Sequence, residues 1–177
     1  MKIIKFANYD IQPWKNGLGL TRLIAEDQKK MWRLSAASVK TISEFSEYCN
    51  CDRLLTVWQG DGLLLNNFTL KKNQIYKFFG ETKILCKPLS AEVIDIGLIY
   101  HRDKFSTSME TFEVTNNKTL CFKTGQNFIF CLEGQFKVLD YSADFGDTLQ
   151  FESSIEIAIE ILAKQCTVLI ISIESIC

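Results

Sequence analysis

A strand–turn–strand pattern occurs twice in this chain, and it limits the fold more than any other feature of the sequence. In each copy an apolar strand ends at a glycine, a second short strand follows, and a glycine-acid pair precedes a further strand. Glycine provides the positive φ that tight turns between antiparallel strands need. The duplication predicts two similar antiparallel β modules. The copies are residues 55–60 and 62–65 with Gly80-Glu81, and residues 128–134 and 136–139 with Gly146-Asp147.

Apolar and polar residues alternate along much of the remaining chain. Isoleucine at every second position of residues 155–161 favours a strand with one apolar face. The alternative is a helix over 154–164, because Glu, Ala, Leu and Lys are good helix formers. Residues 104–118 are polar and show no strand pattern, so we expect a linker between the two halves. Further strands are expected at residues 33–39, 54–58, 63–65, 75–79, 84–86, 93–98 and 168–173.

The composition is that of a globular protein with a sizeable apolar core. The chain has 177 residues, 47% of them hydrophobic, and a formal charge of −1. A nearly neutral chain without a basic block is not expected to bind nucleic acid or an anionic membrane. Residues 1–10 lack the apolar run of a signal peptide, and residues 168–173 are too short for a membrane span. We therefore expect a cytoplasmic protein.

Histidine and cysteine usage limits the chemistry further. His101 is the single histidine, whereas zinc, non-haem iron and copper sites commonly use two or three imidazoles. The cysteines are odd in number and mostly have apolar neighbours, as expected of reduced, buried thiols. Cys49 and Cys51 form a C-x-C pair, for which half of a metal or redox site is the alternative interpretation. We expect no metal and no cofactor.

The most unusual segment is PWKNGLGLTR at residues 13–22. Gly17 and Gly19 suggest a turn with accessible backbone N–H groups, surrounded by donor side chains, which suits a carboxylate or another small anion. A phosphate-binding loop of the P-loop or dinucleotide type is not indicated, because the glycine spacing differs and no helix pattern follows. The donor side chains are those of Lys15, Asn16, Thr21 and Arg22.

Together with four other motifs, this segment resembles the HutD/Ves family of small bacterial bicupin proteins. The resemblance implies an all-β bicupin, with two cupin-like jelly-roll barrels packed together and few short helices. It also implies a protein without established catalytic activity that senses or binds an acidic intermediate of histidine utilisation, such as formylglutamate. The motifs are PWKNGLGLTR at 13–22, WRLSAASV at 32–39, FSEY at 45–48, DRLLTVWQGDGLLL at 52–65 and GDTL at 146–149.

The two barrels are expected at residues 1–103, which carry the PWKNG signature, and at residues 104–177. They would form one closely packed unit, and exchange of the N-terminal strands into the second barrel is left open.

One stretch, residues 95–102, departs from the family pattern of Asp, aromatic, Asn, Leu and Met followed by two arginines. If the replaced residues contact ligand in relatives, this chain binds a different ligand or binds it more weakly. The pattern is kept at Asp95, Leu98 and Arg102. It is changed at three positions, where the Asn, the Met and the first Arg are replaced by Gly97, Ile99 and His101. In addition, a proline before the first glycine-acid turn is replaced by Phe79.

Arginines at the borders of apolar strands are the strongest candidates for ligand contact. A guanidinium can clamp a carboxylate through two hydrogen bonds. For Arg33 and Arg53 the alternative is a structural ion pair with Asp52, Asp95 or Glu44. The predicted ligand-binding residues are Trp14, Lys15, Asn16, Arg33, Arg53, Asp95, His101 and Arg102, and we assign no catalytic and no metal-binding residue.

Aromatic residues and the histidine also have two interpretations each. Trp14 and Trp58 either stack on a ligand or pack at strand ends. His101 is either a general base, alone or activating a nucleophile, or a polar surface residue.

The leading hypothesis is a metal-free bicupin that binds a small acidic metabolite in its first barrel in a sensing or regulatory role. The alternative is a metal-independent isomerase or lyase acting on a small carboxylate, with an acid/base pair drawn from Asp95, Lys15, Tyr48 or His101. A third hypothesis is an interaction module that pairs through sheet edges, with a large apolar patch and no closed pocket. The residues favour a binding protein over an enzyme, and a homodimer is left open.

Overall fold

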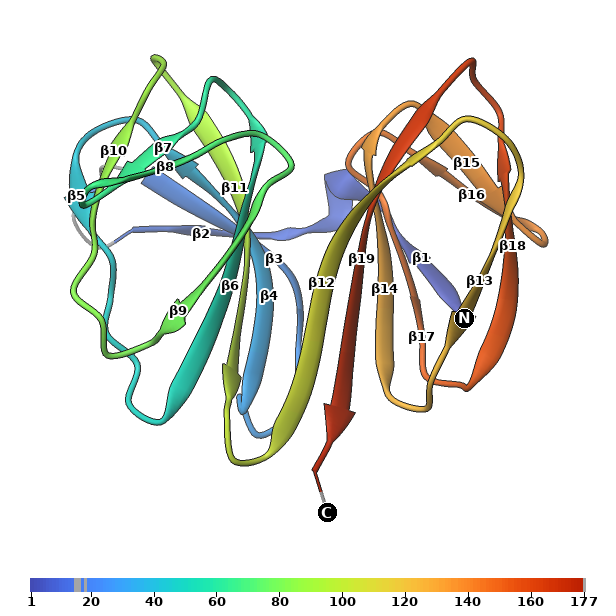
Figure 1. The fold of residues 1–177 in the computed structure, drawn as a ribbon, viewed down its shortest axis with the longest axis horizontal. Coiled ribbons are helices and arrows are strands. Elements are labelled where there is room, and N and C mark those ends of the chain that lie inside the picture. Colours follow the sequence, from blue (N-terminus) through green and yellow to red (C-terminus); the bar gives the residue numbers. More distant parts are fainter. Residues whose placement is uncertain (15–16, 18, 177) are drawn as a thin grey trace. The chain divides into compact units, whose positions relative to one another are not determined.

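The computed structural model describes residues 1–14, 17 and 19–176, and almost all of its regular structure is strand (Figure 1). The one helical element in these ranges is a single 3₁₀ turn, η1 at Phe6–Asn8. The prediction of an all-β fold with few short helices is therefore confirmed. In the same ranges no helix has the length and apolar character needed to cross a membrane.

The chain forms two compact units. The central unit is Asp10–Lys104, and the terminal unit combines Met1–Tyr9 with Phe105–Cys177. Residues 1–9 were expected with the first barrel or as exchanged strands, and in the structure they pair within the terminal unit. The strand at the N-terminus, β1 (Lys2–Ile4), runs antiparallel to β17 (Thr148–Phe151).

The central unit consists of two antiparallel sheets (Figure 1). The larger has the order β2-β3-β4-β11-β6-β9, and the smaller has the order β5-β10-β7-β8. Their bounds are β2 Asp10–Pro13, β3 Gly19–Glu26, β4 Trp32–Val39, β5 Ser43–Glu44, β6 Cys51–Gln59, β7 Leu63–Leu65, β8 Phe68–Leu70, β9 Ile75–Phe79, β10 Leu85–Pro88 and β11 Val93–His101.

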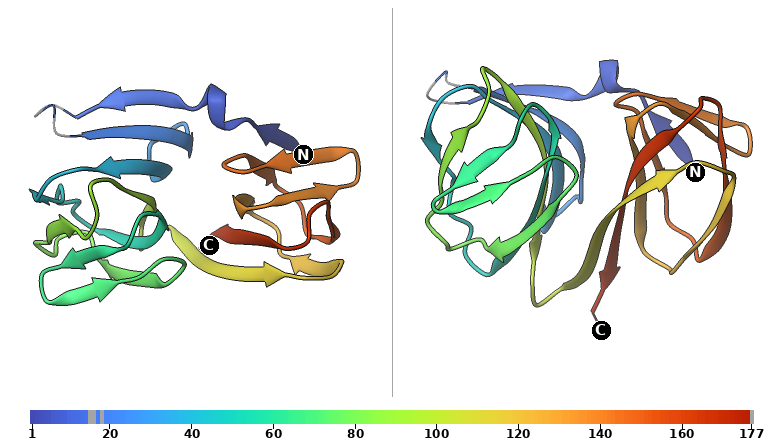
Figure 2. Two further views of the ribbon diagram at one scale, coloured as in Figure 1. Left: turned by 90° about the horizontal axis from the view of Figure 1, so that it is seen from above. Right: turned by 45° about the horizontal axis from the view of Figure 1, so that its top comes forward.

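The terminal unit repeats this plan with a five-stranded and a four-stranded sheet, and Figure 2 shows its strands from two further sides. The larger sheet has the order β1-β17-β14-β19-β12, and the smaller has the order β13-β18-β15-β16. The remaining bounds are β12 Phe105–Val114, β13 Lys118–Phe122, β14 Gln126–Glu133, β15 Gln135–Val138, β16 Tyr141–Asp144, β18 Ile155–Ile161 and β19 Cys166–Ser175.

Each unit has its own apolar core, to which both of its sheets contribute. In the central unit Leu55 and Val57 of the larger sheet pack with Leu63 and Leu65 of the smaller one. In the terminal unit the core takes its residues from all the strands of the smaller sheet and most of the larger, including the fully buried Phe136. Period-two alternation produces these cores, since every second residue of a strand points to the same side.

The duplicated modules are confirmed as strand–turn–strand units. β6 leads through Gly60 into β7, and β14 leads through Gly134 into β15. The two glycines have φ of 95° and 80°, where a side chain would be strained, and a Cβ at Gly60 would lie 2.8 Å from the carbonyl oxygen of Glu92. The alternating isoleucines form β18, so the strand prediction for residues 155–161 is confirmed. The alternative of a helix over residues 154–164 is wrong.

The linker predicted at residues 104–118 is wrong for most of its length. β12 is a ten-residue strand at the edge of its sheet, and it pairs with β19 along its full length. Phe112 and Val114 of β12 pack on the core of the terminal unit. The opposite face carries Thr107 and Thr111 beside the buried Met109, while Ser and Glu stand at the positions between them. Because small polar residues stand on both faces, the apolar alternation that marks other strands is weak here.

A carboxylate fastens the N-terminal segment to the terminal unit. Asp147 is 4% exposed, and it accepts hydrogen bonds from the backbone N–H of Phe6 at 2.9 Å and from Lys5 Nζ at 2.7 Å. Tyr9 Oη donates to the carbonyl oxygen of Gly146 at 2.7 Å. The glycine-acid pair of the second module thus holds the first nine residues in place.

Candidate functional site

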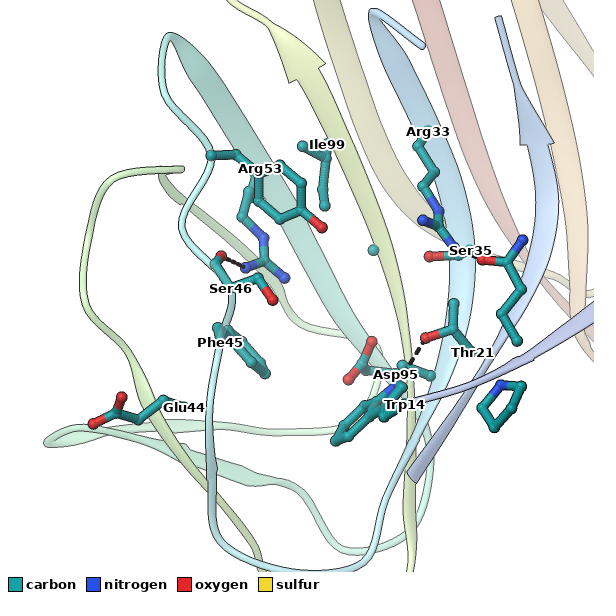
Figure 3. Close-up of a pocket in the computed structure, with 15 residues that line it drawn as sticks. Trp14, Thr21, Arg33, Ser35, Glu44, Phe45, Ser46, Arg53, Asp95 and Ile99 are labelled. Atoms are coloured by element: carbon teal, nitrogen blue, oxygen red, sulfur yellow. Dashed lines mark hydrogen bonds between the residues drawn. The ribbon is translucent and has the colours of Figure 1, made fainter. Parts of the chain in front are cut away.

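The central unit contains a cavity of about 490 Å³ on the inner face of its six-stranded sheet. Its lining combines two arginines, two carboxylic acids, aromatic rings and small residues (Figure 3). The lining residues are Gln12, Pro13, Trp14, Thr21, Arg33, Ser35, Ala37, Glu44, Phe45, Ser46, Tyr48, Arg53, Asp95, Gly97 and Ile99.

Strand register explains why these residues meet. β11 lies between β4 and β6, and its Ile99 is opposite Arg33 on one side and Arg53 on the other. Two residues along, Gly97 is opposite Ser35 of β4. Two further along, Asp95 is opposite Ala37 of β4 and Val57 of β6. Side chains at every second position of a strand share one face, so the side chains of Ile99 and Asp95 and their partners across the sheet point to the same side, where the cavity lies.

Arg53 is held by aromatic rings. Its Cζ lies 4.6 Å from the ring centroid of Phe45, 5.0 Å from that of Phe78 and 5.8 Å from that of Tyr48. With described residues it makes one hydrogen bond, from Nη1 to the carbonyl oxygen of Ser46 at 3.3 Å. Burial lowers the pKa of Arg53, and the nearby Asp95 offsets this in part. Toward the described residues, four of its five N–H donors therefore make no hydrogen bond.

Arg33 approaches the cavity from β4. Its Nη2 donates to Gln12 Oε1 at 2.6 Å, while its Nε is buried without a hydrogen-bond partner. Among described residues, neither Arg33 nor Arg53 forms an ion pair with Asp52, Asp95 or Glu44. The structural pairing considered from the sequence is thus absent from this part of the chain.

Asp95 is the most buried acid of the cavity, with 3% of its surface exposed. Its Oδ2 is buried without a hydrogen-bond partner. Burial raises the pKa of Asp95 to about 7, although Arg53 acts to lower it. Figure 3 shows Asp95 and Arg53 reaching into the same space from neighbouring strands. The cavity therefore holds a cation and an acid that do not neutralise one another by direct contact.

The PWKNGLGLTR segment contributes Pro13, Trp14 and Thr21 to the cavity. Trp14 Nε1 donates to Thr21 Oγ1 at 2.9 Å, which fixes the indole ring (Figure 3). Gly17 donates its backbone N–H to the carbonyl oxygen of Trp14 at 2.9 Å, so this N–H is not free for an anion as the sequence suggested. Lys15 and Asn16, both predicted ligand contacts, lie outside the described residues.

Two further predicted contacts, His101 and Arg102, do not line the cavity. Arg102 is bound by Asp52 Oδ1 at 2.8 Å and by Glu81 Oε2 at 2.6 Å. Burial alone would raise the pKa of Asp52, but the hydrogen bonds from Lys77 and Arg102 outweigh it and lower this pKa. His101 ends β11, and its Nδ1 is buried without a partner. Ligand contact by His101 and Arg102 remains a prediction to which the cavity lends no support.

Several lining residues had not been predicted to bind ligand. Ser35 could have been found, since it shares the inward row of a predicted strand with Arg33. Phe45 and Tyr48 belong to the FSEY motif, but nothing in the motif shows that its rings surround Arg53. Gln12 lies on a strand that the sequence did not reveal. Trp58, a candidate for stacking on ligand, is 1% exposed and does not line the cavity, so its side chain is a core residue.

Metal ligands are not gathered in the described part of the chain. No group of three or more His, Cys, Asp or Glu side chains there could hold a metal ion. Cys49 and Cys51 are free thiols, and burial raises the pKa of Cys51, which disfavours the thiolate that metal binding needs.

Known proteins share both the sequence motifs and the fold. The HutD family model matches residues 6–169. A protein of Pseudomonas putida, described as an uncharacterized 21.2 kDa protein in the hutC 3′ region, is 30% identical over 126 residues, which is 66% of each chain.

Solved structures of other proteins have the same fold as this chain. HutD from Pseudomonas fluorescens SBW25 has a TM-score of 0.83 at 23% identity and covers 98% of both chains. A cupin 2 conserved barrel domain protein from Leptotrichia buccalis has a TM-score of 0.62 at 14% identity, with 98% of this chain and 96% of that chain covered. The prediction of a bicupin fold is confirmed by these likenesses, and the match of the family model over nearly the whole length shows that the chain belongs to the HutD family.

Proposed function

We propose that the central unit binds a small acidic metabolite, with Arg53 as the principal contact of its carboxylate. The observation that carries this proposal is the state of Arg53: a half-buried guanidinium between aromatic rings, with one hydrogen bond at 3.3 Å to described residues. A buried charge is costly unless it is paired. A carboxylate accepts two parallel N–H donors from a guanidinium and so would satisfy this group.

The rest of the cavity supports a small ligand. Arg33 offers a buried, unpaired Nε, and Thr21 and Ser35 offer hydroxyl groups at the same face. A volume of about 490 Å³ lies within the range of small-molecule sites. Trp14 and Phe45 supply apolar surface for the carbon skeleton of the ligand. This combination of a cation, hydroxyl groups and aromatic walls fits an acid with a short aliphatic chain.

The biological role that we propose is sensing or regulation in histidine utilisation. The Pseudomonas putida relative is described by its place in the hutC 3′ region, and membership of the HutD family points the same way. Formylglutamate is the acid that the family resemblance suggested, and the cytoplasm is the expected compartment. Gly97 lines the cavity at a position where the family resemblance implies an Asn, so the affinity for this acid is part of the test.

Isothermal titration calorimetry with N-formyl-L-glutamate, L-glutamate and glutarate tests the proposal. We expect at least one acid to bind, and Arg53→Met to weaken it by about 30-fold or more, as for loss of one partner of a buried charge pair. Arg22→Met is the matched control, since Arg22 lies on β3 of the same sheet and does not line the cavity. Lack of binding by all three acids at millimolar concentration, or equal weakening by both variants, would contradict the proposal.

A second candidate function is a metal-independent isomerase or lyase acting on a small carboxylate. The observation that favours it is Asp95, whose pKa is raised to about 7 by burial in the cavity, as a general acid or base requires. Proton NMR in D₂O, with each acid that binds, would detect exchange of carbon-bound hydrogen or turnover. Either signal, lost in Asp95→Asn, would establish catalysis; unchanged acid after long incubation would leave the binding role.

A further inference from the structure

The cavity places an acid where an acidic ligand is proposed to bind. Asp95 is 3% exposed and its Oδ2 has no hydrogen-bond partner, whereas Arg53 lies one strand away without forming an ion pair with it. A carboxylate bound by Arg53 would bring a second negative charge into this enclosed space. Two carboxylates that share a site do not both stay ionised, because the charge of each raises the pKa of the other.

The groups around Asp95 determine where the compensating proton can go. The strand neighbours directly opposite, Ala37 and Val57, carry no charge. Burial raises the pKa of the Cys86 thiol to about 12, so this group stays neutral near pH 7. Of the described lining residues, Glu44 is the other acid, and it is exposed to solvent. The titratable and charged groups that line the cavity or act on Asp95 are Arg33 on β4, Glu44 on β5, Tyr48 after β5, Arg53 on β6 and Cys86 on β10.

We propose that Asp95 is a proton-taking specificity residue: it is a neutral carboxylic acid in the complex and donates a hydrogen bond from its carboxyl group to the ligand. This inference rests on the proposed function, since it needs an acid bound at Arg53. The proton comes from solvent when the ligand enters at a pH where Asp95 is ionised, and it returns to solvent when the ligand leaves. No bond other than that O–H bond forms or breaks.

The direction of the pH dependence follows from this scheme. Burial raises the pKa of Asp95 to about 7 in the free protein, so below about pH 6 the group is already protonated and affinity does not change. Above about pH 7 each unit of pH reduces the protonated fraction tenfold, and the affinity falls by up to about tenfold per unit. The site therefore responds to both acid concentration and pH.

Calorimetric titration with glutarate from pH 6 to 9 is the test, because both carboxyl groups of this probe are ionised above about pH 6.5. Buffers with different ionisation enthalpies give the number of protons taken up. We expect the wild type to take up nearly one proton per glutarate at pH 8.5 and to lose up to about tenfold in affinity per unit above pH 7.5. Asp95→Asn carries no titrating group, so its affinity should be constant, with no proton uptake, and tighter than the wild type at pH 8.5.

Glu44→Gln is the matched control, since it removes the other acid of the lining and should leave both proton uptake and the pH dependence unchanged. Glutarate binding without proton uptake, or proton uptake that persists in Asp95→Asn, overturns this inference while the proposed function stands. Failure of all acids to bind even at pH 6 overturns both. If Asp95→Asn does not fold, a ¹³Cγ NMR titration of Asp95 in the wild type decides the matter: its pKa must rise on saturation with glutarate.

Discussion

The two units are built on the same module, yet positions that line the cavity of the central unit correspond to hydrogen-bonded or core residues in the terminal unit. Aligning Gly60 of the central unit with Gly134 of the terminal unit also aligns an irregularity in strand pairing just before each glycine, at Trp58 and Leu132. Four cavity-lining positions on β6 and β11 then differ, and one of them is Ile99, which corresponds to Ser172. Arg53 corresponds to Asn127, Asp95 to Val168, and Gly97 to Ile170.

The corresponding residues of the terminal unit have their hydrogen bonds satisfied by the chain or pack in the apolar core. Asn127 is 1% exposed, donates through Nδ2 to the carbonyl oxygens of Lys123 and Gly125, and accepts from Ser172 Oγ at 2.7 Å. Val168 and Ile170 belong to the apolar core. The comparison teaches that a few inward substitutions on one scaffold accompany the cavity of the central unit, and the predictions below test that statement.

The largest expected effect concerns how each interior tolerates a truncated isoleucine. Ile170 is 9% exposed in the packed core, so Ile170→Ala should destabilise the terminal unit by about 2–5 kcal/mol through lost burial and an unfilled void. Ile99 already faces a cavity, so Ile99→Ala should cost the central unit less than about 1.5 kcal/mol. Hydrogen-exchange mass spectrometry in urea reports the two units separately. Equal costs would show that the interiors do not differ as described.

Second in size is the effect of giving the central unit the valine of its counterpart. Asp95→Val removes an acid whose pKa burial raises to about 7, so the variant should be more stable at pH 8 by on the order of 2–4 kcal/mol. Native Asp95 keeps its proton while the unfolded chain releases it above about pH 4, and this lowers the wild-type stability between about pH 4 and 7. The difference between variant and wild type should grow over that interval and then stay constant.

Tryptophan fluorescence during unfolding measures the difference in stability between Asp95→Val and the wild type. It reports the central unit selectively, because Trp14, Trp32 and Trp58 all belong to that unit. Glu44→Val, at the exposed acid of the same cavity, serves as control and should show no such pH-dependent gain. A difference that is constant from pH 4 to 8 would mean that Asp95 titrates normally.

The acids of the two glycine-acid turns, Asp147 and Glu81, should differ in how much they stabilise their units, and this third effect is smaller. Asp147→Ala removes the acceptor of the Phe6 N–H and of Lys5, and should destabilise the terminal unit by about 2 kcal/mol, with faster amide exchange in residues 2–9. Its counterpart Glu81 is exposed; the hydrogen bond from Arg102 lowers the pKa of Glu81 to about 2. Glu81→Ala should therefore have the weaker effect. Unchanged exchange in residues 2–9 of Asp147→Ala would show that β1 alone holds this segment.

How far the sequence predicted this comparison depends on the kind of feature. The duplicated strand–glycine–strand pattern is local, because alternation and turn glycines depend on near neighbours, so both modules were found. β12 was not, because small polar residues such as Ser108 and Thr111 stand on both of its faces and weaken the alternation. The pairing of β1 with β17 joins residues more than 140 positions apart, and no local pattern encodes it.

The candidate site was predicted in part for the same reason. Arg33, Arg53, Asp95 and Trp14 were identified by residue type and strand position, and all four line the cavity. The aromatic rings around Arg53 come from Phe45, Tyr48 and Phe78 on other segments, so only the folded chain reveals them. His101 and Arg102 lie on the same strand or just after it, yet the cavity ends at Ile99. Motif proximity predicted them, but His101 is the last residue of the strand and Arg102 lies beyond it, so neither lines the cavity.

Gly97 offers the smallest and most selective way to test the origin of the cavity. A Cβ at this position would lie 3.5 Å from Leu55 Cδ1 and 4.0 Å from Asp95 Oδ1, which are ordinary contacts, so Gly97→Ala should change the free energy of unfolding by less than about 1 kcal/mol. Gly134→Ala is the opposite control, because φ of 80° disfavours a side chain there. Larger residues at position 97 should reduce affinity for glutarate stepwise, from Ala to Val to Ile, as the side chain there approaches that of Ile170 in the terminal unit. If Gly97→Ile keeps wild-type affinity, the missing side chain at this position is not what makes room for the ligand, and the explanation must move to Arg53 and Asp95 alone.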